Sequence, residues 1–112
     1  MQKKEGQAAE TVEAEIRRII LPRGRQNFGI IVRMLGASRV EVKCFDGRTR
    51  LCRIPGRLKR KIWVRPGDLV IVEPWELGGE EKGDIIFRYT GTQVGWLRSH
   101  GKLPKVEGIE EF

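Results

Sequence analysis

Cysteine and histidine are scarce in this chain, and their scarcity limits the chemistry that it can perform. Its 112 residues include two cysteines, Cys44 and Cys52, and a single histidine, His100. A structural zinc site needs about four Cys or His ligands, usually in closely spaced pairs, so the sequence predicts no metal site. Without a CxxC pair, we expect both thiols to be reduced, as in cytosolic proteins, with a Cys44–Cys52 disulfide as the minor alternative.

Long apolar stretches are also missing. No run approaches the roughly 20 residues that span a membrane. The opening MQKKEGQAAETVEAEI lacks the continuous apolar segment of a secretory signal. We therefore expect a cytoplasmic protein that does not associate with membranes.

Catalytic patterns are absent from the sequence as well. It contains no GxxxxGK[ST] motif for nucleotide phosphates, and His100 stands alone in a segment flanked by glycines. The carboxylates cluster in a glycine-rich stretch and toward the ends, where solvation explains them. Because an enzyme needs convergent acid, base or nucleophile groups, the sequence predicts neither an enzyme nor a bound cofactor.

What the chain has in excess is positive charge, and this charge is concentrated in one part of it. The net charge is +7, yet residues 16–65 hold fifteen Lys and Arg against only Glu41 and Asp46. Acids outnumber bases in the segments on either side. A polarised surface of this kind favours one orientation toward a polyanion, because one side is attracted and the other is repelled. The alternative is a set of cations scattered over a solvated surface.

Short β-branched and alternating segments predict five strands. They cover residues 28–35, 39–45, 48–54, 68–75 and 85–89. The alternation in RVEVKCF places Val40, Val42 and Cys44 on the inner face. The fourth segment is almost wholly apolar, which indicates that both of its faces are covered.

Turn signals separate these strands. Asp46-Gly47 predicts a type I′ hairpin turn, which needs positive φ at both central residues. Pro66-Gly67 predicts a type II turn. The stretch ELGGEEKGD predicts a glycine-rich acidic hairpin loop, with its carboxylates at Glu76, Glu80, Glu81 and Asp84.

Three further segments complete the expected organisation. Residues 12–21 have apolar spacing that suits a helix or a leading strand equally. The connector between the third and fourth strands predicts a short helix or a structured loop, and residues 90–101 predict a short C-terminal helix. We expect three parts: a flexible N-terminal tail and lead-in (1–22), a folded domain with the C-terminal helix (23–104), and an acidic C-terminal tail (105–112).

The order of these elements predicts the fold. Three strands in a meander, a connector and a final hairpin are typical of an all-β, five-stranded OB-fold barrel of the S1-like kind. Such barrels bind nucleic acid across their second and third strands. An SH3-like or Sm-like barrel is the alternative, because five short strands do not define how a barrel closes.

The connector IPGRLKRKIWVRPGD, residues 54–68, carries the densest group of cations. Guanidinium and ammonium groups of this kind suit phosphates. They are Arg57, Lys59, Arg60, Lys61 and Arg65, and the adjoining strands add Arg39, Lys43, Arg48, Arg50 and Arg53. Trp63 lies among them and either stacks on an unpaired base or anchors the connector in the core, whereas Trp75 and Trp96 are expected to be structural. This pattern favours recognition of folded RNA by its phosphates and shape.

Two other functions fit the same residues. One is a general single-stranded RNA-binding or RNA-chaperone domain on the same barrel. The other is a protein-interaction module that binds a basic partner through the acidic hairpin loop.

Several separate motifs resemble the translation initiation factor 1A family of archaea and eukaryotes, which is related to bacterial initiation factor 1. They are MLG, CFDG, RLCRIPGRLKRKIWVRPGD and GKLP, and the similarity spans about residues 28–104. The resemblance implies an OB-fold protein that binds the small (30S) ribosomal subunit at the decoding A site through rRNA. It also implies that the protein stabilises initiator Met-tRNA binding and promotes dissociation of ribosomes into subunits.

The resemblance also implies which residues make contacts. The RNA-facing segment of the family maps onto Arg57, Lys59, Arg60, Lys61 and Trp63, and we extend it to Arg39, Arg53 and Arg65. The closing GIEEF is similar in character to the family segment that touches the translation GTPase initiation factor 5B. This similarity makes Ile109, Glu110, Glu111 and Phe112 candidate partner contacts. We expect a monomer that acts by binding alone, without catalytic turnover.

Overall fold

The computed structural model describes residues 11–56 and 64–104. Within these ranges the chain forms two compact units. One unit contains residues 11–20 and 89–103, and the other contains residues 21–56, 64–88 and 104.

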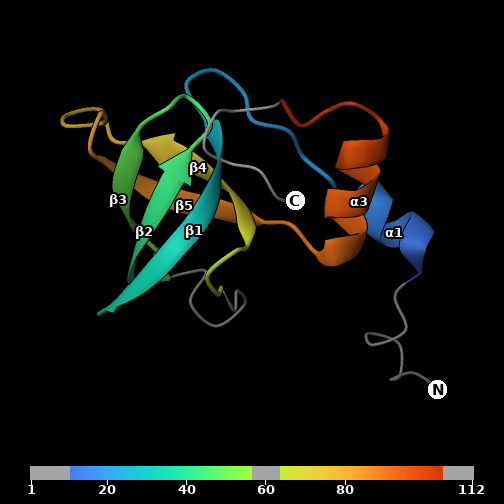
Figure 1. The fold of residues 1–112 in the computed structure, drawn as a ribbon, viewed down its shortest axis with the longest axis horizontal. Coiled ribbons are helices and arrows are strands. Elements are labelled where there is room, and N and C mark those ends of the chain that lie inside the picture. The colour runs from blue at the N-terminus through green and yellow to red at the C-terminus, as the bar shows by residue number, and fades with distance from the viewer. Residues whose placement is uncertain (1–10, 57–63, 105–112) are drawn as a thin grey trace. The chain divides into compact units, whose positions relative to one another are not determined.

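The larger unit is a closed barrel of five strands (Figure 1). The strands are β1 (Asn27–Gly36), β2 (Arg39–Cys44), β3 (Thr49–Arg53), β4 (Leu69–Pro74) and β5 (Lys82–Arg88). Around the barrel they follow the order β1-β2-β3-β5-β4, in which β3 and β5 pair in parallel and all other neighbours pair antiparallel. This closed, five-stranded arrangement is the OB fold, so the fold prediction is confirmed.

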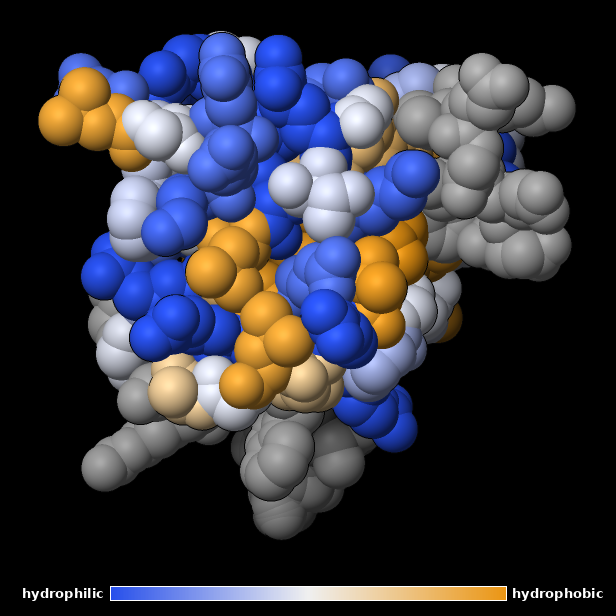
Figure 2. All heavy atoms as spheres, turned by 60° about the vertical axis from the view of Figure 1, so that its left-hand side comes forward, coloured by the Kyte–Doolittle hydropathy of each residue, from blue (hydrophilic) through white to orange (hydrophobic). Residues whose placement is uncertain are grey.

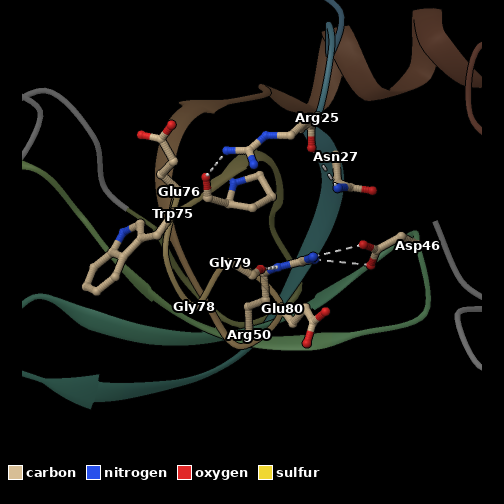
Figure 3. Close-up of a pocket in the computed structure, with 10 residues that line it drawn as sticks. Arg25, Asn27, Asp46, Arg50, Trp75, Glu76, Gly78, Gly79 and Glu80 are labelled. Carbon is tan, nitrogen blue, oxygen red and sulfur yellow. Dashed lines mark hydrogen bonds and ion pairs between the residues drawn. The ribbon is translucent and has the colours of Figure 1, made fainter.

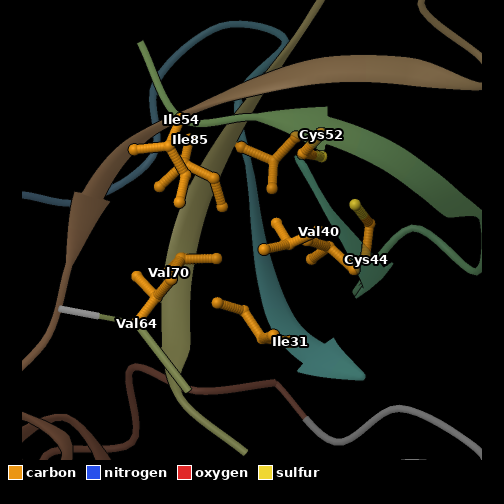
Figure 4. Packing of buried hydrophobic residues seen from close by; sticks show 10 residues of the cluster. Ile31, Val40, Cys44, Cys52, Ile54, Val64, Val70 and Ile85 are labelled. Atoms are coloured by element: carbon orange, nitrogen blue, oxygen red, sulfur yellow. The ribbon is translucent and has the colours of Figure 1, made fainter. Parts of the chain in front are cut away.

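The interior of the barrel is filled by the residues that the alternation predicts. Val40, Val42 and Cys44 of β2 are fully buried, while the residues between them are not. Figure 4 shows how side chains from β1, β2, β3, β4 and β5 converge on this core, together with Ile54 and Val64 from the connector. β4 is buried along most of its length, as its unbroken apolar run indicated.

Both cysteines are free and belong to this core. Cys52 pairs in register with Val40 of β2, so Cys44 lies four residues further along that strand. At about 3.3 Å per residue this offset exceeds the Cα separation of roughly 7 Å that a disulfide allows. Burial raises the pKa of the Cys52 thiol to about 12, which keeps it protonated.

The turn between β2 and β3 differs from the prediction. In the β2–β3 turn the amide of Gly47 donates to the carbonyl of Cys44 at 3.0 Å, and of the turn residues only Gly47 has a positive φ, 94°. The prediction of a type I′ turn at Asp46-Gly47 is therefore wrong. Phe45 and Asp46 occupy the centre of this turn, and Gly47 is the left-handed residue that follows it, as in three-residue hairpin loops.

Positive φ at both central residues occurs instead in the β1–β2 turn. Gly36 and Arg39 are paired, and Ala37 and Ser38 between them have φ values of 51° and 62°. Neither residue is a glycine or asparagine, which carry such conformations most easily. The predicted type II turn is confirmed, because Gly67 has a φ of 95° and the Asp68 amide donates to the Arg65 carbonyl.

β5 begins three residues earlier than predicted, at Lys82, because its first residues pair with β3. Gly83 is required inside this strand, since a Cβ there would lie 2.8 Å from Cγ1 of Val72. Asp84 therefore belongs to β5 and not to the acidic hairpin loop in which the sequence pattern places it.

The smaller unit contains two helices. The ambiguous segment forms α1 (Val12–Arg17), and the predicted C-terminal helix is confirmed as α3 (Gly91–Ser99). Thr90 caps α3 through a capping box with Gln93, a motif that satisfies two otherwise unpaired amides. Glu15 of α1 accepts from both residues, through its carboxylate at 2.7 Å from Thr90 Oγ1 and its carbonyl at 2.8 Å from Gln93 Nε2. Neither helix is long and apolar enough to cross a membrane. The division at residues 22 and 104 stays a prediction.

Candidate nucleic-acid interface

The outer face of β2 and β3 brings two of the predicted RNA-binding residues together. Arg39 lies directly opposite Arg53 in the antiparallel register, and both are exposed. Like charges facing each other across a strand pair destabilise a sheet. An anion bound between these two guanidinium groups would relieve that repulsion.

Arg53 is held by a carboxylate from the neighbouring strand. Its Nε and Nη2 donate to the two oxygens of Asp84 at 3.1 and 3.3 Å, because the parallel register pairs residue 53 with residue 84. Asp84 also accepts the indole N–H of Trp75 at 3.0 Å. Arg53 lies 5.4 Å from the centre of the Trp75 ring, and Lys82 Nζ lies 5.7 Å from it. These distances are those of cation–π contacts.

A hollow of about 330 Å³ opens beside this cluster. Three cations line it, namely Arg39, Arg53 and Lys82. The other lining residues are Ala37, Leu51, Cys52 and Trp75. Leu51 lies between Glu41 of β2 and Lys82 of β5 in the strand registers. The hollow therefore sits on the β2–β3–β5 face, across which OB folds bind their ligands.

Arg50 does not belong to this outer surface, contrary to the prediction. Its side chain turns inward and is only 4% exposed. Figure 3 shows its guanidinium aimed at Asp46, with donor–acceptor distances of 3.1 and 2.9 Å, while its Nε donates to the Gly79 carbonyl. Burial alone would lower the pKa of Arg50, but the hydrogen bonds to Asp46 and Cys44 outweigh burial and raise it. Arg50 therefore closes one end of the barrel, where a carboxylate of the same chain neutralises its charge.

The ion pair with Arg50 also favours the charged form of Asp46. Burial by itself would raise the pKa of Asp46, but the hydrogen bonds from the Arg50 guanidinium and the Arg48 amide lower it below its usual value. The charged carboxylate is therefore favoured in the folded protein. The larger hollow in Figure 3, about 560 Å³, contains this pair together with Arg25, which donates to the Pro74 carbonyl at 3.2 Å.

The remaining predicted residues are distributed as follows. Arg65 is exposed in the type II turn, where its amide donates to Asp68 at 2.9 Å, and it does not line the hollows of about 330 and 560 Å³. Arg57, Lys59, Arg60, Lys61 and Trp63 lie outside the described residues, as do Ile109, Glu110, Glu111 and Phe112.

Trp75 and Lys82 are members of this face that the sequence patterns do not identify. Those patterns predict a purely structural role for Trp75 and a loop position for Lys82. Their place on this face depends on the parallel pairing of β3 with β5. This pairing forms only when the barrel closes, so no local pattern in the sequence could have identified the two residues.

Most of the described cations form no ion pair with the protein's own carboxylates. Within the described ranges, ion pairs join Arg33 to Glu41, Arg50 to Asp46 and Arg53 to Asp84, whereas Arg39 and Lys43 form none with a described carboxylate. Figure 2 shows the β3 side of the barrel, where hydrophilic residues cover most of the surface and surround a smaller apolar area. No group of three or more potential metal ligands occurs in the part of the chain that the structure covers.

Comparison with known proteins gives consistent matches. The family model described as "Translation initiation factor 1A / IF-1" matches residues 10–111. Translation initiation factor 1A of Pyrococcus abyssi is 52% identical over 89 residues, 80% of this chain and 79% of that protein. The same factor of Methanococcus aeolicus is 60% identical over 88 residues, 77% of this chain and 84% of that protein. A solution structure of translation initiation factor 1 from a Wolbachia endosymbiont of Brugia malayi is 31% identical, with a TM-score of 0.48 over 62% of this chain and 82% of that one.

Proposed function

The chain belongs to the translation initiation factor 1A / IF-1 family, and from this membership we propose that it binds the small (30S) ribosomal subunit at the decoding A site. Its role is in translation initiation. Bound there, it stabilises initiator Met-tRNA on the subunit and promotes dissociation of ribosomes into subunits. A blocking role of this kind needs occupancy and shape, so no catalytic turnover and no cofactor enter the proposal.

The observation that carries the proposal is the cationic outer face of β2 and β3 in a protein of this family. Arg39 and Arg53 face each other there, and of the two only Arg53 pairs with a described carboxylate, that of Asp84. RNA phosphates would neutralise the pair and release the counterions condensed on the RNA. We propose that Arg57, Lys59, Arg60, Lys61, Trp63 and Arg65 extend this contact along the connector.

The proposal includes partners beyond rRNA. Ile109, Glu110, Glu111 and Phe112 are the candidate contacts for the translation GTPase initiation factor 5B. The protein acts as a monomer in the cytoplasm, as a component of the initiator tRNA complex on the subunit.

The test is a binding assay with purified small subunits. Replacing Arg57, Lys59, Arg60 and Lys61 by Ala is expected to weaken binding. The slope of log K against log salt should become shallower by about 0.7–0.9 for each phosphate that the variant no longer neutralises. The melting temperature should stay nearly unchanged, since the proposal assigns these four cations to RNA and not to contacts within the protein.

A matched control removes the same charge elsewhere. Arg17, Arg23, Arg98 and Lys102 are exposed, and their fourfold replacement by Ala should leave subunit affinity close to that of the wild type. Equally weakened binding in both variants would show that net charge alone drives binding and would refute the assigned surface. Equal affinity of the wild type for subunits and for unstructured oligonucleotides would favour a general single-stranded RNA-binding domain instead.

A further inference from the structure

We infer that Asp84 is a positioning residue for RNA binding, which fixes the Arg53 guanidinium in one orientation and leaves one of its edges free for a phosphate. The inference rests on the proposed function, since it assumes that Arg53 contacts RNA. It assigns a role in binding RNA to a negatively charged side chain, which by its charge alone would repel the RNA.

The hydrogen bonds of Asp84 occupy only one side of the Arg53 guanidinium. The two carboxylate oxygens accept from Nε at 3.1 Å and from Nη2 at 3.3 Å. A guanidinium has five N–H donors, so both hydrogens of Nη1 and the second hydrogen of Nη2 are not used in this pair. The edge formed by Nη1 and Nη2 can therefore bind a phosphate through two parallel N–H bonds, as arginine often does.

The two partners differ in exposure. The side chain of Arg53 is 57% exposed, whereas that of Asp84 is 26% exposed. The guanidinium is thus the more accessible member of the pair. RNA can reach its free edge without displacing the carboxylate that holds the other side.

Asp84 is itself held in place, as a positioning group must be. It accepts the indole N–H of Trp75 at 3.0 Å, and it lies on β5, paired in the parallel register with Arg53 of β3. The Trp75 ring lies 5.4 Å from the Arg53 guanidinium and supports it from a second direction. Because the arginine is ordered before RNA arrives, less conformational entropy is lost when the complex forms.

The charge of Asp84 and its positioning role predict opposite effects for Asp84→Asn. If the carboxylate acted only through its charge, the substitution would strengthen binding to the RNA polyanion. Asn replaces one of the two acceptor oxygens of Asp84 by an NH₂ group, so the hold on Arg53 is lost. Ordering one long side chain during binding lowers affinity by about 2- to 12-fold. We therefore expect Asp84→Asn to bind small ribosomal subunits about 2- to 12-fold more weakly than the wild type.

Glu73→Gln is the matched control. Glu73 is exposed, lies directly opposite Asp84 in the β4–β5 register and lines the same hollow of about 490 Å³. It forms no ion pair with a cation in the described ranges. Its substitution removes an equal charge from the same place without releasing Arg53, so Glu73→Gln should bind at least as tightly as the wild type.

A second pair of variants separates positioning from damage to the barrel. In a protein that carries Arg53→Ala, Asp84 has no guanidinium to hold, and adding Asp84→Asn should weaken binding no further. Damage to the barrel would weaken binding whether or not Arg53 is present. Thermal unfolding in the binding buffer shows whether each variant is folded at the assay temperature.

A measurement on the wild type needs no substitution. Arg39 serves as an internal reference, because it is exposed and forms no ion pair with a described carboxylate. In NMR spectra of the free protein, the Nε–H proton of Arg53 should exchange with water more slowly than that of Arg39. Equal exchange rates would show that Arg53 is not ordered before RNA binds and would refute the inference.

The outcomes distinguish this inference from the proposed function. If the wild type fails to bind small subunits, the proposed function is wrong, and the inference is wrong with it. If the wild type binds, but Asp84→Asn binds equally or more tightly, Asp84 is not a positioning residue and the proposed function stands. The same conclusion follows if Asp84→Asn weakens binding to the same extent in the Arg53→Ala protein.

Discussion

Replacing Asp46 by Asn is expected to destabilise the barrel more than a substitution at an exposed loop residue usually does. The change removes the negative charge that faces the buried Arg50 guanidinium and replaces one of its two acceptor oxygens with an NH₂ group. Breaking a fully buried ion pair costs about 3–5 kcal/mol. The Asp46 side chain is 33% exposed, and Arg50 keeps the Gly79 carbonyl, so we expect a decrease of about 2 kcal/mol in the free energy of unfolding.

The assay is urea denaturation at pH 7, followed by the same measurement at lower pH. A decrease of this size corresponds to roughly 10 °C in melting temperature for a domain of this length. The pKa of Asp46 is lowered in the folded state, so its contribution is complete above the unfolded pKa of about 3.9. It disappears as the pH falls through the folded value. The difference between wild type and Asp46→Asn should therefore be constant from about pH 7 to about 5 and shrink below about 4.

Glu41→Gln is the matched control. It removes an equal charge from the pair of Glu41 with Arg33, whose side chains are 29% and 68% exposed, and exposed pairs contribute about 0–1 kcal/mol. If Asp46→Asn cost no more than Glu41→Gln, or if its effect did not begin to shrink as the pH fell below about 4, the assignment of Arg50 as a buried, carboxylate-dependent cation would be refuted.

Three further results are expected from the barrel. Gly29→Ala should destabilise it by about 1–3 kcal/mol in thermal unfolding, because the new Cβ would lie 2.5 Å from Cγ1 of Val42; unchanged stability would mean that β1 and β2 are further apart. Ala37→Asn with Ser38→Gly should stabilise the protein by about 1 kcal/mol, since both positions have positive φ, and a decrease in stability would contradict the turn. Cys52, with its pKa raised to about 12, should react with iodoacetamide at about pH 8.5 at least about 100-fold more slowly in the native protein than in urea; equal rates would contradict its burial.

The sequence alone was sufficient for several features that depend on near neighbours, although it predicted the wrong turn type at Asp46-Gly47. Alternation along Arg39–Cys44 predicted which residues of β2 are buried, and the pattern around Gly91–Ser99 predicted α3. The charge asymmetry and the motifs spread over residues 34–104 pointed to the family. Periodicity involves residues two to four positions apart, so a linear pattern is enough to reveal it.

The tertiary structure decided the remainder. β3 meets β5 only when the barrel closes. This pairing brings Arg53 into contact with Asp84 and Trp75, which lie 31 and 22 residues away along the chain. The same closure turns Arg50 inward, which a sequence pattern does not predict, since an arginine is rarely buried unless it is paired. Contacts across a barrel depend on which strands become neighbours, and the free energy that selects those neighbours comes from burying the whole core at once. For this reason the sequence predicted Arg39 and Arg53 as cations of this face, but it predicted neither the inward turn of Arg50 nor the place of Trp75 and Lys82 on the face.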